Sequence, residues 1–205
     1  MLKSTKLKNT LLVGTTTILV SCGGQNEIKM GSYAYDAEFL KKHGIEYTEL
    51  VSADGNSKVM VIPAWQGRVM TSSASGDEGD SFGWINYRFI DKGEISTQFN
   101  PVGGEERFWL GPEGGPFSLY FKGGQEQVYD NWVVPAVLDT EPFKVEAQNE
   151  SSIRFVKDTR LTNASGTTFD INIDRIVSLM DADKVAADFN IQLTNDMKIV
   201  AYKSE

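Results

Sequence analysis

The feature that most constrains the fold is the alternation of apolar and polar residues in the last third of the chain. Residues 169–174 alternate strictly, and runs typical of strands cover 143–147, 152–157 and 160–162. Successive side chains of a strand point to opposite faces of a sheet, so these runs predict strands with one buried face and one solvent-exposed face. Residues 163–166, Asn-Ala-Ser-Gly, include residue types that are common in turns, and they separate two of the runs. The pattern predicts antiparallel sheet.

Earlier residues continue this pattern. Residues 45–51 and 58–62 flank Asp54-Gly55, a dipeptide typical of a tight hairpin turn. Further strands are expected at 67–71, 188–194 and 197–202. The count is about ten strands, with no internal repeat and no alternation of strands with helices. These features predict an all-β protein, an antiparallel β-sandwich with one or two short helices.

Helical signals are few. Residues 35–44 predict a short helix, which Asp36 caps at its start and Gly44 ends. A helical turn is expected at 181–187. His43, the only histidine of the chain, stands at the end of the first helix, where a histidine usually contacts the last carbonyl groups. We therefore expect no catalytic role for it.

The first 21 residues have the composition of an export signal. Three lysines stand among the first eight residues, and the mostly apolar run 11–20 is too short to span a bilayer. Leu19-Val20-Ser21 then precedes Cys22, the only cysteine, in an arrangement similar to a bacterial lipoprotein box. Cys22 is therefore the expected site of lipidation, and no disulfide can form within the chain. An ordinary signal peptide that happens to be followed by a cysteine is the alternative.

These signals divide the chain into a signal peptide at 1–21, a lipidated cysteine and polar tether at 22–32, and a body at 33–205. No aspartate follows Cys22, which favours the outer membrane; whether the body faces the periplasm or the outside stays open. The lipid anchor is the expected contact with the membrane. The net charge of −8 argues against a nucleic-acid partner, because phosphate binding needs clustered lysines and arginines.

The most unusual stretch is 103–121, which is rich in glycine and aromatic residues. Arg107 and Glu113 provide directional hydrogen bonds, and Trp109 provides a flat apolar face. Such groups suit a polyhydroxylated ligand, so carbohydrate is the predicted partner. The alternative is a loop with one buried arginine–glutamate pair and a core tryptophan, and for Trp109 the core is the favoured place.

Several other groups are weaker candidates. Trp84 and Asn86, in the aromatic segment 81–87, are predicted ligand contacts, although the segment as a whole is expected in the core. Residues 130–132 are either a second ligand edge or a turn with an anchoring tryptophan, and the turn is favoured. The acidic loop 72–80 lacks the spacing of a calcium loop, so no metal site and no cofactor are expected.

Four segments carry a resemblance to a known superfamily. They are Gly67-Arg68-Val69-Met70, residues 82–86, residues 103–115, and Asp174-Arg175 with Val200-Ala201-Tyr202. With these, residues 33–205 resemble the galactose mutarotase-like supersandwich superfamily, and more closely a group of Bacteroidetes lipoproteins within it. The resemblance implies two large antiparallel sheets, a sugar in a cleft, and epimerase-type chemistry.

The sequence departs from that superfamily in two respects. Aldose epimerases use a glutamate base and a histidine acid, and His43 does not sit in their motif. The superfamily domain is also longer, with its catalytic glutamate in the later half. The chain is therefore either a part of a longer domain or without epimerase machinery. Two further functions stay open: a carboxylate enzyme acting through Glu105, Glu106 or Glu113, and a structural envelope subunit with no small ligand.

Overall fold

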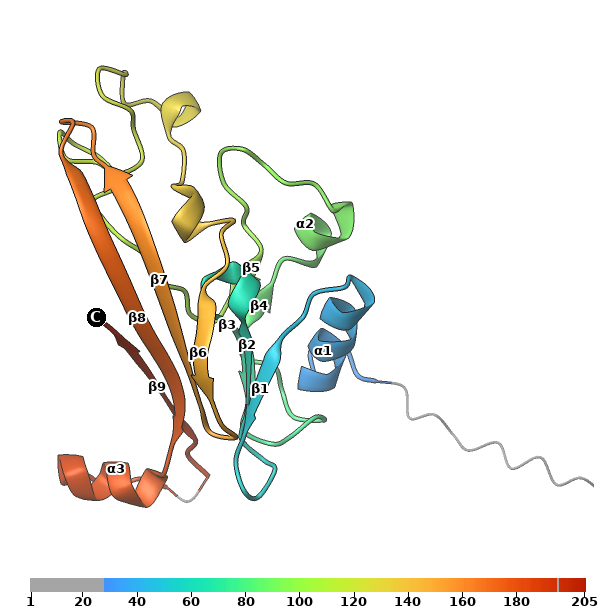
Figure 1. Cartoon of the computed structure of the whole chain (residues 1–205). Coiled ribbons are helices and arrows are strands. Elements are labelled where there is room, and N and C mark those ends of the chain that lie inside the picture. Colours follow the sequence, from blue (N-terminus) through green and yellow to red (C-terminus); the bar gives the residue numbers. More distant parts are fainter. Residues whose placement is uncertain (1–27, 195) are drawn as a thin grey trace, which may run out of the picture.

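The structure is a computed structural model that describes residues 28–194 and 196–205 (Figure 1). The predicted signal peptide and Cys22 lie outside the described residues. Within the described residues, no helix combines the length and the apolar character needed to cross a bilayer.

The first sheet has three antiparallel strands in the order β1-β2-β3. They are β1 (Thr48–Val51), β2 (Lys58–Ile62) and β3 (Arg68–Ser73). The predicted hairpin is confirmed, because β1 pairs with β2 across the turn at Asp54. The Asp54 carboxylate accepts the backbone N–H of Asn56 at 3.0 Å, which holds the turn.

The second sheet has four antiparallel strands in the order β6-β7-β8-β9. They are β6 (Lys144–Gln148), β7 (Ser152–Thr162), β8 (Thr168–Met180) and β9 (Ile199–Ser204). The two runs predicted at 152–157 and 160–162 are one strand, because the pairing with β8 continues without a break. The strand predicted at 188–194 is wrong: α3 (Ala182–Phe189) occupies its start, and no regular element follows directly.

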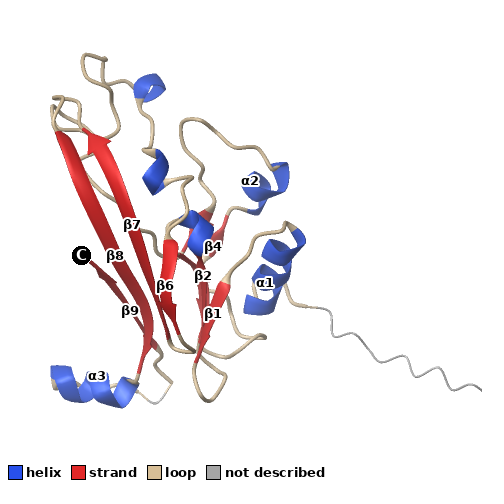
Figure 2. Ribbon diagram, in the orientation of Figure 1, coloured by secondary structure: helices blue, strands red, loops and turns tan. Residues whose placement is uncertain are grey.

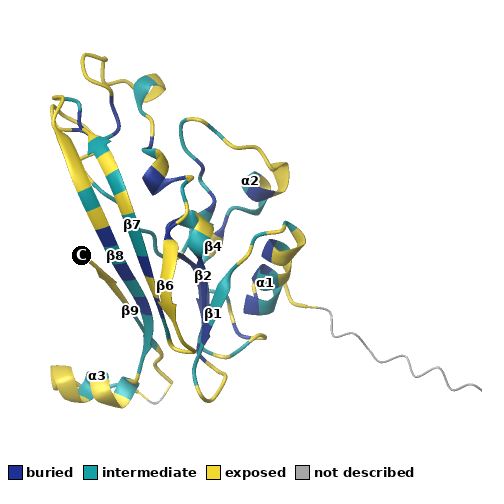
Figure 3. Ribbon diagram, in the orientation of Figure 1, coloured by how far each residue is buried: buried dark blue, intermediate teal, exposed yellow. Residues whose placement is uncertain are grey.

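One hydrophobic core joins the two sheets. Leu50, Val59, Val61 and Val69 come from the first sheet, and Ile153, Phe155, Ile173 and Val177 from the second. Figure 3 shows the buried residues of β7 and β8 concentrated in the part of the hairpin nearest the first sheet. The opposite face of the second sheet carries ion pairs such as Arg154–Asp174. The fold is therefore mostly antiparallel β, as predicted.

Two helices cover the other face of the first sheet (Figure 2). They are α1 (Tyr33–Lys42) and α2 (Tyr87–Lys92). A second core contains Leu40 of α1 and Ile90 of α2 together with Met60 and Ile62 of β2. Together with α3, the described residues thus contain three α-helices, where one or two were expected.

The α1 prediction needs a correction at both ends. The helix begins two residues earlier than predicted, because the hydroxyl of Ser32 accepts the N–H of Tyr35 and caps it. Asp36 is instead buried inside the helix, where it accepts hydrogen bonds from Ser81 and Tyr87. His43 is the C-terminal capping residue, one position before Gly44.

The aromatic segment 81–87 is also corrected. Phe82 and Trp84 were expected in the core, but they are 61% and 64% exposed. Trp84 lies on β4 (Trp84–Ile85), which pairs with β5 (Gly103–Gly104) at the start of the glycine-rich stretch. A Cβ on Gly103 would collide with the carbonyl oxygen of Trp84, so this close pairing requires glycine.

Candidate functional site

One cleft in the described residues has a volume of about 850 Å³. It lies between the central loops and the far end of the β7–β8 hairpin. Its walls come from residues 95–97, 119–123, 125, 130–131, 133–136, 139–140 and 161–163. Ligand pockets in proteins commonly have volumes of roughly 300–1,000 Å³, so the cleft has room for a small organic molecule.

Polar side chains are set into largely apolar walls of this cleft. Asp130 belongs to the short helix η2 (Tyr129–Asn131) and is exposed. Asn163 is only 5% exposed, and its Oδ1 accepts hydrogen bonds from Ser165 and Thr167. Within the described residues no acceptor contacts its Nδ2, which is therefore available as a donor at the cleft wall.

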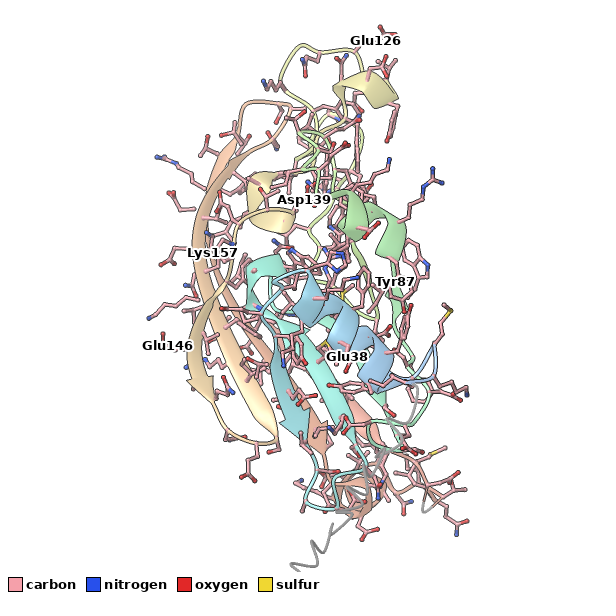
Figure 4. All side chains as sticks on the ribbon, turned by 90° about the vertical axis from the view of Figure 1, so that its right-hand side faces the viewer. Glu38, Tyr87, Glu126, Asp139, Glu146 and Lys157 are labelled. Carbon is pink, nitrogen blue, oxygen red and sulfur yellow. The ribbon has the colours of Figure 1, made fainter. Side chains whose placement is uncertain are left out.

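Asp139 is the buried carboxylate of the cleft. It follows the short helix η3 (Ala136–Leu138) and is 7% exposed. Asn100 donates its backbone N–H and its side-chain amide to Asp139 Oδ2, at 3.1 and 2.7 Å. Figure 4 shows Asp139 in the middle of the molecule, far from Glu126 at the tip of the neighbouring loop. These hydrogen bonds fix the position of the Asp139 carboxylate in the lining of the cleft.

A second cleft, of about 480 Å³, adjoins the first. Ile95, Asp139 and Thr140 line both clefts. The second cleft also contains Trp65 of the short helix η1 (Pro63–Trp65) and His43, whose Nδ1 lies 2.8 Å from the carbonyl oxygen of Phe39. Within the described residues, no group of three or more potential metal ligands is assembled, here or elsewhere.

Tyr120, which lines the larger cleft, belongs to a stack of aromatic rings. Tyr120 is buried, and its ring stacks on Trp132 with centroids 5.6 Å apart and planes within 5°. Trp109 packs on Tyr120 at 5.2 Å, and Tyr129 on Trp132 at 6.2 Å. The Tyr120 hydroxyl donates to the carbonyl of Leu110 at 2.6 Å. The packing of Trp132 on Tyr120 agrees with the prediction that residues 130–132 form a turn held in place by this tryptophan.

Arg107 lies at the inner end of this stack. Its guanidinium carbon is 3.6 Å from the centroid of the Trp109 ring, and Nη2 donates to the carbonyl oxygen of Leu138 at 3.2 Å. Burial lowers the pKa of Arg107, and burial together with the nearby Arg107 charge lowers the pKa of Arg68 to about 10. Leu138 precedes Asp139, so Arg107 supports the cleft wall from behind.

The structure brings three of the predicted ligand contacts together. Trp109 Nε1 donates to Glu113 Oε1 at 2.7 Å, while Arg107 covers the face of the same indole. None of these three side chains lines either of the two clefts. The favoured placement of Trp109 in the core agrees with its half-buried position against the first hydrophobic cluster.

The other predicted contacts lie elsewhere. Trp84 is exposed on β4, and Asn86 caps α2 by accepting the N–H of Phe89 while its amide donates to Pro101. Glu105 is exposed, and the pKa of Tyr202 rises to about 12 through burial and the neighbouring carboxylates Glu105 and Glu106. The structure therefore does not assemble the predicted residues into one site.

Glu106 has a structural partner that the sequence did not indicate. Its carboxylate forms an ion pair with the buried guanidinium of Arg175 on β8. The same arginine donates to the carbonyl of Gly67 at 3.3 Å. The adjacent Glu105 takes no part in this ion pair.

Three cleft residues were missed by sequence reasoning: Tyr120, Asp139 and Asn163. Tyr120 looked like one aromatic among many, and Asn163 looked like a turn residue. Asp139 stands in an unremarkable acidic segment. The only available signal was the turn chemistry of 163–166, which fixes a polar side chain at the tip of a hairpin.

A family model matches residues 31–205, and it describes a family of unknown function, DUF6786. The chain belongs to this family. Neither a curated protein nor a solved structure shows significant similarity to the chain. The DUF6786 match covers the whole described body except its first three residues, so both sheets and both clefts are features of the matched region.

Proposed function

We propose that this DUF6786 protein is an envelope lipoprotein that binds carbohydrate in the 850 Å³ cleft. The observation that carries the proposal is the combination of a largely apolar wall that includes Tyr120 with polar groups at Asp130, Asp139 and Asn163, of which Asp139 and Asn163 are held by hydrogen bonds. A sugar presents both C–H faces and hydroxyl groups, so it requires both kinds of surface.

The polar groups have complementary hydrogen-bonding roles. The carboxylates of Asp130 and Asp139 accept hydrogen bonds from hydroxyl groups, and Nδ2 of Asn163 donates one. Hydrogen bonds to a charged acceptor contribute about 1.5–3 kcal/mol each. Because Asp139 is held by Asn100, its geometry is fixed before a ligand arrives, which lowers the entropic cost of binding.

The surroundings of Glu105 and Glu106, the two predicted catalytic residues, favour binding over catalysis. Glu106 is held by the buried Arg175, and neither Glu105 nor Glu106 lines the cleft. In this proposal the glycine-rich stretch has a supporting role. Arg107 and Trp109 hold Tyr120 and Leu138, whose neighbours form the cleft wall.

The proposal extends to fold and location. The shared core between the two antiparallel sheets supports a sandwich of the supersandwich type. The export signal followed by Cys22 supports a lipid anchor in the outer membrane. Residues 22–32 then tether the body to the membrane, and the body needs no membrane-binding surface of its own.

Thermal unfolding of the full chain in detergent, alone and with a panel of neutral monosaccharides, tests this function. A sugar present at 100 times its dissociation constant adds about 2.7 kcal/mol to the free energy of unfolding. One sugar class is therefore expected to raise the melting temperature. Unfolding that no sugar in the panel or its oligomers shifts would contradict the proposal and favour a structural envelope subunit.

A further inference from the structure

The two clefts share part of their walls, and this bears on the size of the ligand. Ile95, Asp139 and Thr140 line both of them, so the 480 Å³ cleft and the 850 Å³ cleft meet at these three residues. A ligand seated beside Asp139 in the first cleft therefore has a second hollow directly next to it. A single sugar ring fills only one of the two.

The second cleft has its own surface for a sugar. Trp65 and Phe89 give it half-buried aromatic walls, and Asn100 and Asp139 add polar groups, of which Asp139 also lines the first cleft. The exposed carboxylates of Asp91 and Glu94 also line the second cleft. Aromatic faces with hydroxyl-accepting carboxylates again match a polyhydroxylated ring.

The charge along both clefts is one-sided. Asp91, Glu94, Asp130 and Asp139 are acidic, and Lys122 is the one lysine or arginine among the lining residues. Like charges brought together at a binding surface lower affinity. Uronic acids and other acidic sugars are therefore disfavoured.

From this arrangement we infer that the ligand is an oligosaccharide without acidic groups, which lies across Asp139 and occupies both clefts. The inference rests on the proposed function and adds the length and charge class of the ligand. The first cleft binds one end of the chain, and the second cleft binds the sugars that follow.

Three exposed alanines allow a matched test. Ala136 lines the first cleft, Ala64 lines the second, and Ala187 on α3 lines neither. Replacement by tryptophan fills a cleft without removing any hydrogen bond of a side chain. Ala187→Trp adds the same bulk to an exposed helix and is the control.

The experiment is calorimetric titration of the full chain in detergent. The probes are glucose, xylose, mannose and N-acetylglucosamine, their oligomers of two to four units, and galacturonic acid oligomers of the same lengths. The affinity for the best neutral series should rise roughly tenfold or more from one unit to three or four, which corresponds to about 1.4 kcal/mol. Galacturonic acid oligomers should bind at least roughly tenfold more weakly.

The variants separate the two clefts. Ala64→Trp should abolish the gain with length and leave the affinity for one unit unchanged, whereas Ala136→Trp should abolish binding of every length. Affinity that does not depend on length, or a length gain that survives Ala64→Trp, would overturn this inference while leaving the proposed function intact. Tighter binding of the acidic oligomers would overturn it as well. Absence of binding by every neutral sugar and oligomer would contradict the proposed function itself and remove the inference with it.

Discussion

The Glu106 carboxylate forms an ion pair with Arg175, whose side chain is only 1% exposed. The pair joins the start of the glycine-rich stretch to β8, across a separation of 69 residues in the chain. Arg175 also donates to Gly67 and to Ser204 Oγ, so its guanidinium bridges three parts of the fold. Glu106 is thus the counter-charge that makes a buried arginine tolerable.

Glu106→Gln should destabilise the fold by about 2–4 kcal/mol, because the Arg175 charge stays buried without its partner. Glu105→Gln is the matched control, since its carboxylate is exposed, and it should change the free energy of unfolding by less than about 0.5 kcal/mol. Urea unfolding of both variants provides the comparison. Equal stability of the two variants would show that the ion pair is not structural.

Arg107→Lys should lower the free energy of unfolding by about 1–2 kcal/mol. An ammonium group lacks the plane that stacks on Trp109 and cannot at the same time donate to Leu138 in the observed geometry. The control is Arg160→Lys. In the wild-type protein the guanidinium of Arg160 pairs with Asp170 at 3.3 Å, and both side chains are exposed. That change should be nearly neutral. If the Arg107 variant is as stable as the control, the stacking has no structural role.

Asp130→Ala should weaken sugar binding roughly tenfold, by loss of a charged hydrogen-bond acceptor in the cleft. Glu126→Ala is the control, because Glu126 lies in the same loop, is exposed and does not line the cleft. Both variants should melt at the wild-type temperature. Calorimetric titration of the best neutral sugar measures the effect. A similar loss of affinity in both variants would point to a general effect of loop charge instead of a contact.

Asp36 should make stability depend on pH. Burial raises the pKa of Asp36 above the ordinary value of 3.8, although hydrogen bonds from Ser81 and Tyr87 act in the opposite direction. Between 3.8 and the higher pKa of the folded state, the folded protein binds more protons than the unfolded chain. The stabilising contribution is therefore complete below 3.8 and is lost as pH rises through the folded-state pKa.

Asp36→Asn should remove this fall in stability, which amounts to at most about 1.4 kcal/mol per pH unit. Asp183→Asn, in the exposed first turn of α3, is the control and should keep the wild-type pH profile. Urea unfolding from about pH 3.5 to 7 gives the slopes. A slope unchanged by Asp36→Asn would assign the pH dependence to other groups.

The proposed membrane anchor gives a prediction that does not depend on the cleft. Cys22→Ser should move the protein from the membrane fraction to the soluble fraction, because a serine cannot carry the thioether-linked lipid. Mass spectrometry of the wild-type protein should find an acylated N-terminal Cys22. An unmodified cysteine in the interior of the mature chain would contradict the lipoprotein interpretation.

Sequence patterns predicted the sheets well because their signals are local. The turn at Asp54-Gly55 and the alternation at 169–174 fix strands through properties of adjacent residues. The helix α2 was missed, because its cap at Asn86 lies in the aromatic segment 81–87, which was expected in the core. The strand predicted at 188–194 failed because α3 continues to Phe189, and its signals there resembled those of a strand.

The candidate site was harder to predict because it depends on distant pairs. Arg107 and Glu113 were expected to face a ligand, but the choice between ligand and core depends on Trp109, Leu138 and Tyr120, which meet Arg107 only in the folded protein. Asp139 gains its position from Asn100, 39 residues earlier. No spacing in the sequence indicates such a contact.

Binding of a carbohydrate in the 850 Å³ cleft is tested most directly by calorimetric titration of the full chain in detergent with its best neutral sugar or oligomer. Wild type and Ala187→Trp should bind the sugar with equal affinity at a single site, and Ala136→Trp should not bind it. Retention of binding by Ala136→Trp would place the sugar elsewhere on the molecule. The absence of binding in wild type across the whole panel would contradict the account.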